Sequence, residues 1–75
     1  MRELIEYMAK SLAQDPDAVR VTESEEDGSW IIQLEVAPHD KGRIIGKGGR
    51  VALAMRTLLR VAAVKQGTRA ILQIV

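Results

Sequence analysis

The residues with the clearest chemical potential lie at 42–50, where glycines alternate with basic residues in the stretch Gly-Arg-Ile-Ile-Gly-Lys-Gly-Gly-Arg. Glycines let a ligand approach main-chain amides, and basic residues attract phosphates. A nucleotide-binding P-loop requires G-x-x-x-x-G-K-[ST], but only three residues separate Gly42 from Gly46, and Gly48 replaces the Ser or Thr that holds magnesium. The dinucleotide pattern G-x-G-x-x-G fails because position 51 is Val51. Nucleotide hydrolysis is therefore rejected.

Two interpretations of these glycines remain open. The first is structural: they turn the chain tightly between two helices. In the second they form a G-x-x-G loop, Gly46-Lys47-Gly48-Gly49, that grips the backbone of a single-stranded nucleic acid. One glycine usually suffices for a turn, and each further glycine costs chain entropy. A third glycine therefore indicates the close approach of another backbone.

Other reactive residues are scarce. The chain has no cysteine and one histidine, His39, which argues against disulfides, thiolate zinc sites and imidazole metal clusters. The serines and threonines lack a base partner, and we expect His39 to lie in a surface loop. No group of residues supports catalysis or calls for a cofactor, so we expect a protein that is not an enzyme.

Charge is distributed unevenly along the 75 residues, which suffice for one small domain spanning 1–75. Residues 1–40 hold ten acidic and three basic residues, whereas residues 41–75 hold eight basic residues and no acidic one. The net charge of +1 conceals this asymmetry. It indicates either an anionic partner for the basic half or neutralisation of one half by the other within the fold.

The apolar fraction of 47% is ordinary for a globular domain and too high for a disordered chain. Because the longest apolar runs are only a few residues, we expect no signal peptide or membrane span and place the protein in the cytoplasm. The only aromatic residues are Tyr7 and Trp30. This scarcity disfavours RRM and OB modules, which stack bases on aromatic rings. We interpret Trp30 as a core anchor.

The first part of the chain predicts one helix and one hairpin. Residues 3–13 place Ile5, Met8 and Leu12 on one helical face, and Pro16 stops the helix near residue 14. Residues 19–23 alternate as a strand does. A turn at 25–28 follows, with Gly28 able to supply a positive φ.

The second part predicts a strand over 30–36, a short helix over 41–45, a long helix over 50–65 that Gly67 closes, and a last strand over 69–75. Asp40 is placed to cap the short helix through its carboxylate. Helices must bury their apolar stripes, so they cover one face of a single small sheet. The fold class is a two-layer α+β domain.

The long helix has two faces of interest. Its predicted core stripe consists of Val51, Ala54, Met55, Leu58, Val61 and Ala62. On the opposite side, Leu53 and Val64 lie among Arg50, Arg56, Thr57 and Arg60. Leu53 is a candidate for a ligand groove. Val64, with Ala63 and Arg60, is a candidate for a small partner-binding face.

At this point the chain resembles a known family. Residues 42–50 are similar to the KH signature, in which an apolar pair precedes Gly, a basic residue, any residue and Gly. The element order resembles the bacterial type II KH domain, αββααβ, with a mixed three-stranded sheet. Length, order and the opening Asp40-x-Gly42-Arg43 resemble the small single-domain KhpA family, over essentially the whole chain.

The resemblance implies a groove walled by the short helix, the loop, the start of the long helix and an edge of the second strand. The RNA-binding residues it implies here are Lys41, Gly42, Arg43, Ile44, Ile45, Gly46, Lys47, Gly48, Gly49, Arg50 and Leu53. Glycine at 46 and 49 removes Cβ atoms that would keep a sugar-phosphate backbone away. Gly48 departs from relatives that carry a bulky or basic residue there. Ile44, Ile45 and Leu53 are equally good candidates for plain core.

The predicted function is therefore non-enzymatic binding of single-stranded RNA with low sequence specificity, as an RNA chaperone or post-transcriptional regulator. The family also implies homodimers and heterodimers with a KhpB (Jag)-type RNA-binding protein. An alternative is a protein-interaction module that dimerises through the long helix and for which RNA contact is secondary. A third possibility is a module of a larger RNA-associated protein, although Met1 and the stop after the last strand favour a complete one.

Overall fold

The computed structural model describes residues 1–75 and contains three helices and three strands. In chain order these are α1 (Arg2–Leu12), β1 (Arg20–Glu26), β2 (Ser29–Glu35), α2 (Lys41–Ile45), α3 (Arg50–Lys65) and β3 (Arg69–Ile74). Short 3₁₀ turns occupy Pro16–Ala18, Pro38–Asp40 and Lys47–Gly49. The order αββααβ is the one predicted, and the bounds of α2 and α3 agree with the prediction.

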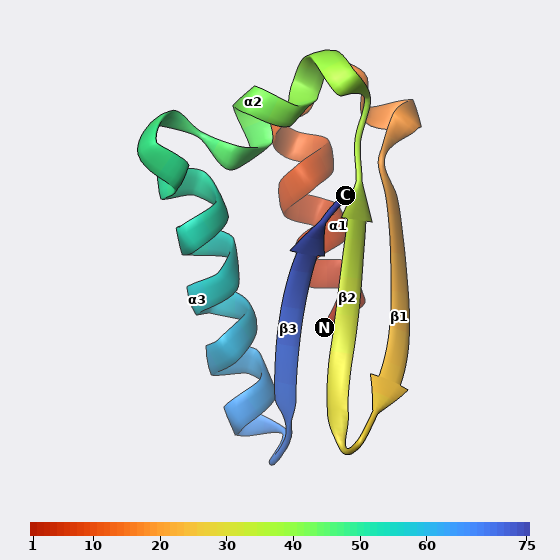
Figure 1. Ribbon diagram of the computed structural model, residues 1–75, viewed down its shortest axis with the longest axis vertical. Coiled ribbons are helices and arrows are strands. Elements are labelled where there is room, and N and C mark those ends of the chain that lie inside the picture. Colours follow the sequence, from red (N-terminus) through yellow and green to blue (C-terminus); the bar gives the residue numbers. More distant parts are fainter.

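The three strands form one mixed sheet in the order β1-β2-β3 (Figure 1). β1 pairs antiparallel with β2, and β3 pairs parallel with β2, so that Val21 faces Leu34 and Leu34 faces Ile74. β2 is therefore the central strand and has no free edge. The expectation that an edge of the second strand walls the groove is wrong, because the parallel crossover through α2 and α3 places β3 at the edge beside α3.

The turn between β1 and β2 consists of Asp27 and Gly28, because Glu26 still pairs with Ser29. Both residues have positive φ, 52° and 79°. This is the backbone that a two-residue type I′ hairpin turn requires. Gly28 adopts the predicted conformation, and the strand before it extends further than its alternating pattern indicated.

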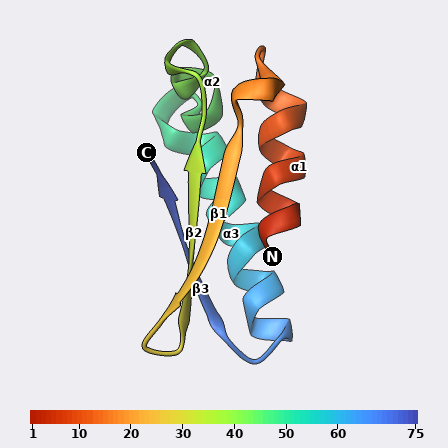
Figure 2. The same cartoon turned by 90° about the vertical axis from the view of Figure 1, so that its right-hand side faces the viewer.

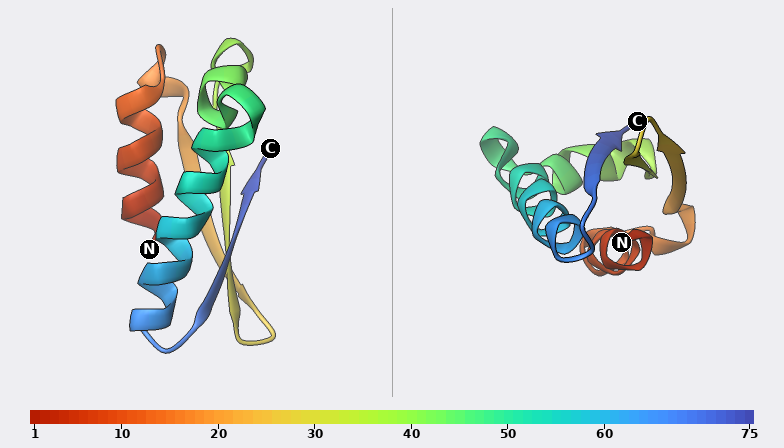
Figure 3. Two further views of the ribbon diagram at one scale, coloured as in Figure 1. Left: turned by 90° about the vertical axis from the view of Figure 1, so that its left-hand side faces the viewer. Right: turned by 90° about the horizontal axis from the view of Figure 1, so that it is seen from below.

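α1 and α3 pack on the same face of the sheet (Figures 2 and 3). The core between them contains the fully buried side chains of Ile5, Ile32, Leu34, Met55 and Leu59. Trp30 is half-buried and packs against this core, as predicted for an anchor. The buried face of α1 differs from the predicted one: Ile5 and Ala9 are buried, Met8 is half-buried and Leu12 is exposed.

The buried face of α3 also differs from the prediction. Its buried residues are Ala52, Met55, Leu59 and Ala63, with Val51 and Ala62 half-buried. The predicted core residues Ala54, Leu58 and Val61 are exposed. Apolar residues surround most of this helix, so periodicity alone did not identify the buried face. The structure buries two alanines, whose size lets the helix lie close to the sheet.

α3 ends in a Schellman motif at Gly67, which has φ of 72°. The amide of Gly67 donates to the carbonyl of Val64 at 3.0 Å, and the amide of Thr68 donates to the carbonyl of Ala63 at 3.0 Å. These bonds satisfy carbonyls that the end of a helix otherwise leaves free. No helix in the structure has the length and apolar character needed to cross a membrane.

Candidate nucleic-acid interface

The loop at residues 46–49 joins α2 to α3 through three glycines with positive φ: 80° at Gly46, 65° at Gly48 and 76° at Gly49. Lys47 and Gly48 are exposed, and Gly49 is half-buried. A Cβ built at Gly48 or Gly49 would meet no heavy atom within 4 Å. The protein therefore leaves open space beside these two positions, and the glycines are required there by backbone conformation alone.

Gly46 differs from the other two glycines. A Cβ at this position would lie 2.5 Å from Cγ2 and 2.9 Å from the backbone nitrogen of Val51, in the first turn of α3. The close approach that requires glycine at 46 thus comes from the protein's own helix. The expectation that Gly46 opens space for a ligand is therefore wrong. At Gly49, in contrast, the space beside the missing side chain is open. The structural interpretation holds at Gly46, and an open loop surface begins after it.

α3 begins at this loop without a capping side chain. Gly49 is its N-cap, in the left-handed conformation, and makes no side-chain cap hydrogen bond. The turn is held from within, because the Gly49 amide donates to the Gly46 carbonyl at 3.0 Å and the Gly46 amide donates to the Gly42 carbonyl at 2.8 Å. The first turn of a helix carries partial positive charge. Here that charge lies at the exposed loop.

The basic residues around the loop are exposed: Lys41, Arg43, Lys47 and Arg50. Only Arg43 lies within ion-pair distance of an acid, with Nε 3.7 Å from Oδ1 of Asp40. None of the other seven basic residues in 41–75 forms an ion pair. Apart from the Arg43–Asp40 pair, the acidic and basic halves therefore do not neutralise each other by direct contacts, and the loop keeps a net positive surface.

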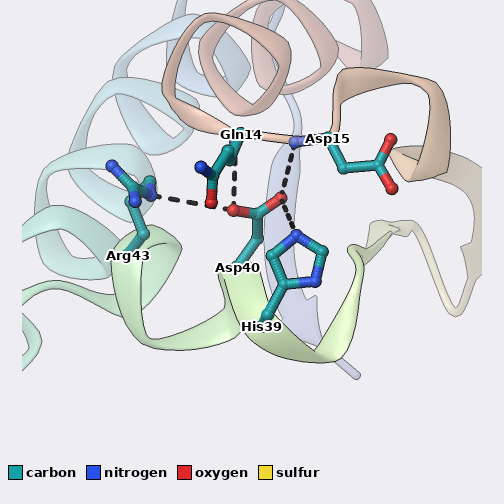
Figure 4. A network of polar contacts seen from close by, with 5 residues as sticks. All are labelled: Gln14, Asp15, His39, Asp40 and Arg43. Atoms are coloured by element: carbon teal, nitrogen blue, oxygen red, sulfur yellow. Dashed lines mark hydrogen bonds and ion pairs between the residues drawn. The ribbon is translucent and has the colours of Figure 1, made fainter.

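Asp40 has a role that the sequence did not indicate. Its side chain is fully buried and makes no cap bond to α2. Instead, Oδ1 accepts the Gln14 amide at 3.0 Å and Oδ2 accepts the Asp15 amide at 2.9 Å (Figure 4). The predicted cap is thus wrong. The carboxylate joins the start of α2, the helix that precedes the glycine loop, to the chain that leaves α1.

The pKa of Asp40 is lowered, chiefly by the hydrogen bond from the Asp15 amide. Burial acts in the opposite direction, but the Gln14 amide and the charges of His39 and Arg43 add to the lowering. Nε2 of His39 lies 3.7 Å from Oδ2. Asp40 is therefore ionised at neutral pH, and nothing in the sequence near residue 40 distinguishes this long-range contact from an ordinary helix cap.

The predicted apolar contacts differ in exposure. Ile44 has no exposed surface and packs in the core. Ile45 is 37% exposed and Leu53 is 62% exposed. Gly42 is exposed as well. Ile45 and Leu53 are therefore the apolar residues that a ligand at the loop can reach, while Ile44 supports the loop from inside. No cluster of three or more potential metal ligands occurs.

Comparison with known proteins gives consistent matches over the whole chain. A family model described as "KhpA/KhpB, KH domain" matches residues 2–74. The chain is 47% identical over 75 residues to "RNA-binding protein KhpA" of Clostridium acetobutylicum. It is 49% identical over 75 residues to the protein of the same name from Caldanaerobacter subterraneus. Each match covers 100% of this chain and 100% of the relative. The chain is 48% identical to the Treponema pallidum protein of the same name, covering 97% of this chain and 91% of that one.

The fold is similar to part of the larger protein Era. A crystal structure of Aquifex aeolicus Era bound to GDP.AlF4- matches 97% of this chain with a TM-score of 0.62 at 20% sequence identity. A second Era structure, in complex with MgGDPNP and nucleotides 1506–1542 of 16S ribosomal RNA, gives the same values. The matched region is 28% of the Era chain in both cases. This likeness supports the fold assignment.

Proposed function

The chain belongs to the KhpA/KhpB family of KH domains, and from this premise we propose that it is a non-enzymatic protein that binds single-stranded RNA through the loop at 46–49. The curated relatives are named RNA-binding proteins, which supports RNA as the ligand. One observation carries the assignment to the loop. Lys41, Lys47 and Arg50 are exposed and unpaired around two glycines with open space beside them.

The loop binds the RNA backbone in this proposal. Gly48 and Gly49 let the strand approach the main chain, and Lys47 and Arg50 contact phosphates from either side. The positive end of α3 faces the same phosphates. A G-x-x-G loop of this kind clamps about four nucleotides. Ile45 and Leu53 offer the exposed apolar surface against which bases rest.

Sequence specificity is low in this proposal. Residues 41–53 contain no Asn, Gln, Ser or Thr, the side chains that, beside arginine, most often read base edges. Contacts to phosphates position a strand without reading its sequence. A cytoplasmic RNA chaperone or post-transcriptional regulator that acts on many RNAs fits this chemistry.

The test replaces Lys47 and Gly48 together by Asp and measures RNA binding by fluorescence anisotropy. The expected loss of affinity exceeds about a hundredfold, because the charge of Lys47 is reversed and a second negative charge is placed where the strand approaches. The matched control is Lys47→Gln with Gly48→Asn, since Asn tolerates positive φ as Asp does but carries no charge. The control should bind with intermediate affinity, and both variants should melt at nearly the same temperature. RNA binding that survives the Asp pair would contradict the proposal.

A second candidate function is protein interaction through α3. Five apolar residues form a continuous exposed band on this helix, which we call the outer band: Leu53, Ala54, Leu58, Val61 and Val64. Leu53 and Val64 are 62% and 68% exposed. Exposed apolar bands of this size on a small protein favour a partner. The partner is a second copy or a KhpB (Jag)-type protein. Ala63 is buried, so it does not belong to this face.

Sedimentation of a Leu58→Glu variant tests the outer band. If the band joins two copies, the charged residue shifts the protein to monomer, because an unpaired carboxylate is costly in an apolar interface. Tyr7→Glu is the matched control, since Tyr7 is 74% exposed and belongs to α1, not to the outer band. An unchanged sedimentation profile for both variants, in the presence and absence of RNA, would remove the band as a site of self-association.

A further inference from the structure

One face of the sheet carries no helix. Figures 2 and 3 show α1 and α3 on the same side of the three strands, so the opposite side meets solvent. Side chains alternate between the two faces along a strand, and the helix side holds the buried residues Ile32, Leu34 and Leu72. The uncovered side therefore consists of the even-numbered residues of β1 and the odd-numbered residues of β2 and β3. We call it the open face.

Two isoleucines lie side by side near the middle of the open face. Ile31 of β2 is the register partner of Ile71 of β3. Ile71 is 51% exposed, and Ile31 is half-buried although no helix covers it. The solvated face of a sheet normally carries polar side chains. An adjacent pair of isoleucines in this place forms an apolar patch that a second molecule can cover.

Charged residues occupy the two ends of the open face, with opposite signs on different strands. At one end, Glu26 of β1 and Arg69 of β3 stand on either side of Ser29, with which both are in register. At the other end, Arg20 of β1 is in register with Glu35 of β2. All four charged side chains are exposed, and none forms an ion pair within the chain. They are therefore available to pair with another molecule.

The pattern of charges complements a second copy of the same face. A two-fold axis parallel to the strands places β1 of each copy over β3 of its partner, and β2 over β2. Glu26 of each copy then faces the partner's Arg69, which gives two ion pairs in one dimer. Ile31 lies next to the axis and packs on its own counterpart. The two copies of Arg20 stand beside the two copies of Glu35, so that these charges compensate each other as well.

We infer that the open face is a contact between two copies of this chain, separate from the outer band on α3, in which Glu26 and Arg69 pair across the two-fold axis. Stacked sheets lie about 10 Å apart, a gap that a glutamate and an arginine side chain span together. RNA fits this face poorly, because Glu26 and Glu35 repel phosphates and no aromatic side chain lies on it. The inference does not depend on the RNA-binding function proposed above.

The size of the open face sets the strength of the contact. Six residues along each strand and three strands across give a patch of about 20 Å by 14 Å. Stable complexes bury about 800 Å² on each partner, so this contact is weak and forms at high protein concentration. Because α3 packs on the other side of the sheet, a chain that uses both the open face and the outer band joins two neighbours and assembles beyond a dimer.

Reversal of charge tests the pairing. Sedimentation equilibrium of the RNA-free Leu58→Glu protein, from about 10 µM to about 1 mM, measures association through the open face without the outer band. In this background, Glu26→Arg and Arg69→Glu should each weaken association by about tenfold or more, because like charges then meet on both sides of the axis. The double variant Glu26→Arg/Arg69→Glu exchanges the two charges and should restore association.

Two further variants complete the test. Glu25→Arg is the matched control for Glu26→Arg, since Glu25 is the neighbouring exposed residue of β1 but points to the helix side of the sheet. It should leave association unchanged. Ile31→Gln removes the apolar contact at the axis and should weaken association by about tenfold. Circular dichroism verifies that each variant is folded.

Four results would overturn the inference. A single mass of one chain at every concentration of Leu58→Glu would mean that the open face does not join copies. Equal weakening by Glu25→Arg and Glu26→Arg would mean that overall charge controls association. Single variants that weaken association without restoration in the double variant would mean that Glu26 and Arg69 do not face each other. A loss of RNA affinity in Arg69→Glu with unchanged sedimentation would assign this part of the face to RNA.

Discussion

The two ends of α3 both use glycine with positive φ, but they are built for different purposes. At the C-terminal end a single glycine, Gly67, completes a Schellman motif whose hydrogen bonds satisfy the helix carbonyls. At the N-terminal end, three glycines precede the helix, no side chain caps it, and exposed basic residues surround it. Both ends reverse the chain.

This comparison shows what a turn requires and what it does not. One glycine is sufficient to end a helix and return the chain to the sheet. At the other end, Gly46 meets the corresponding structural need by making room for Val51. Gly48 and Gly49 add two more residues whose backbone loses entropy on folding, and a Cβ at either position would meet open space. Under the function proposed above, this open space admits the RNA backbone.

The largest effect on stability should come from Gly46→Ala. The new methyl group would lie within 3 Å of Val51 atoms, including a backbone nitrogen that cannot move alone, and the residue would keep a positive φ. Strain and overpacking together should lower the free energy of unfolding by about 2–4 kcal/mol. Urea unfolding measures this loss. A variant as stable as the unmodified protein would show that Val51 adjusts freely and that all three glycines are alike.

A second prediction concerns the contact that holds the start of α2. Asp40→Asn leaves one of the two amides, of Gln14 or Asp15, facing a donor in place of an acceptor, so the urea midpoint at pH 7 should fall. The pKa of Asp40 is lower in the folded protein, so its stabilisation is complete above the ordinary value of about 3.9 and is lost as pH falls through the folded value. The difference between the two proteins should therefore begin to shrink below about pH 4 and disappear once the pH is below the lowered pKa of folded Asp40. A difference that persists in acid would mean that the charge of Asp40 does not contribute.

Gly48→Ala and Gly67→Ala should lower stability equally but differ in their effect on RNA binding. Each places a methyl group in open space at positive φ and should lower the free energy of unfolding by about 1 kcal/mol. Only Gly48→Ala should weaken RNA binding, because its methyl group lies where the strand approaches. Unfolding and anisotropy measurements on both variants give the comparison. Equal RNA affinities would mean that the loop does not contact the strand.

The smallest effects should appear in the salt dependence of binding to a strand short enough to contact only the loop. If the four basic residues at the loop all contact phosphates, log affinity should fall with log salt with a slope of about −3, at about 0.7 per contact. Arg50→Gln should reduce the slope to about −2. Arg43→Gln should change it less, because Asp40 lies 3.7 Å from Arg43 and already compensates part of its charge. A flat salt dependence would exclude phosphate contacts altogether.

The sequence predicted the helices and strands well because the residues that end them lie within or next to each element. Pro16 and Gly67 mark helix ends, and Gly28 marks the hairpin turn. The helices at 41–45 and 50–65 are separated by glycines, so their bounds follow from the sequence. The openness of the loop at Gly48 and the exposure of Leu53 and Val64 also agree with the sequence interpretation.

The remaining features depend on contacts between distant residues. Periodicity did not identify the buried face of α3, because its choice depends on how closely the alanines let the helix approach β3. Asp40 resembles a helix cap in sequence, but its partners precede it by 25 and 26 residues. The place of β3 at the edge of the sheet depends on the parallel crossover from β2. No pattern within a single element contains this information.

The parallel pairing of β2 with β3 has a consequence for the newly made chain. Residues 29–34 pair with residues 69–74, so the sheet is incomplete until forty further residues have left the ribosome. α3 has no finished sheet to pack on before that point, so the glycine bend in front of it is not yet held against the fold. We therefore expect that a nascent chain cannot engage nucleic acid through this bend and acquires that ability in one late step, when the final strand docks.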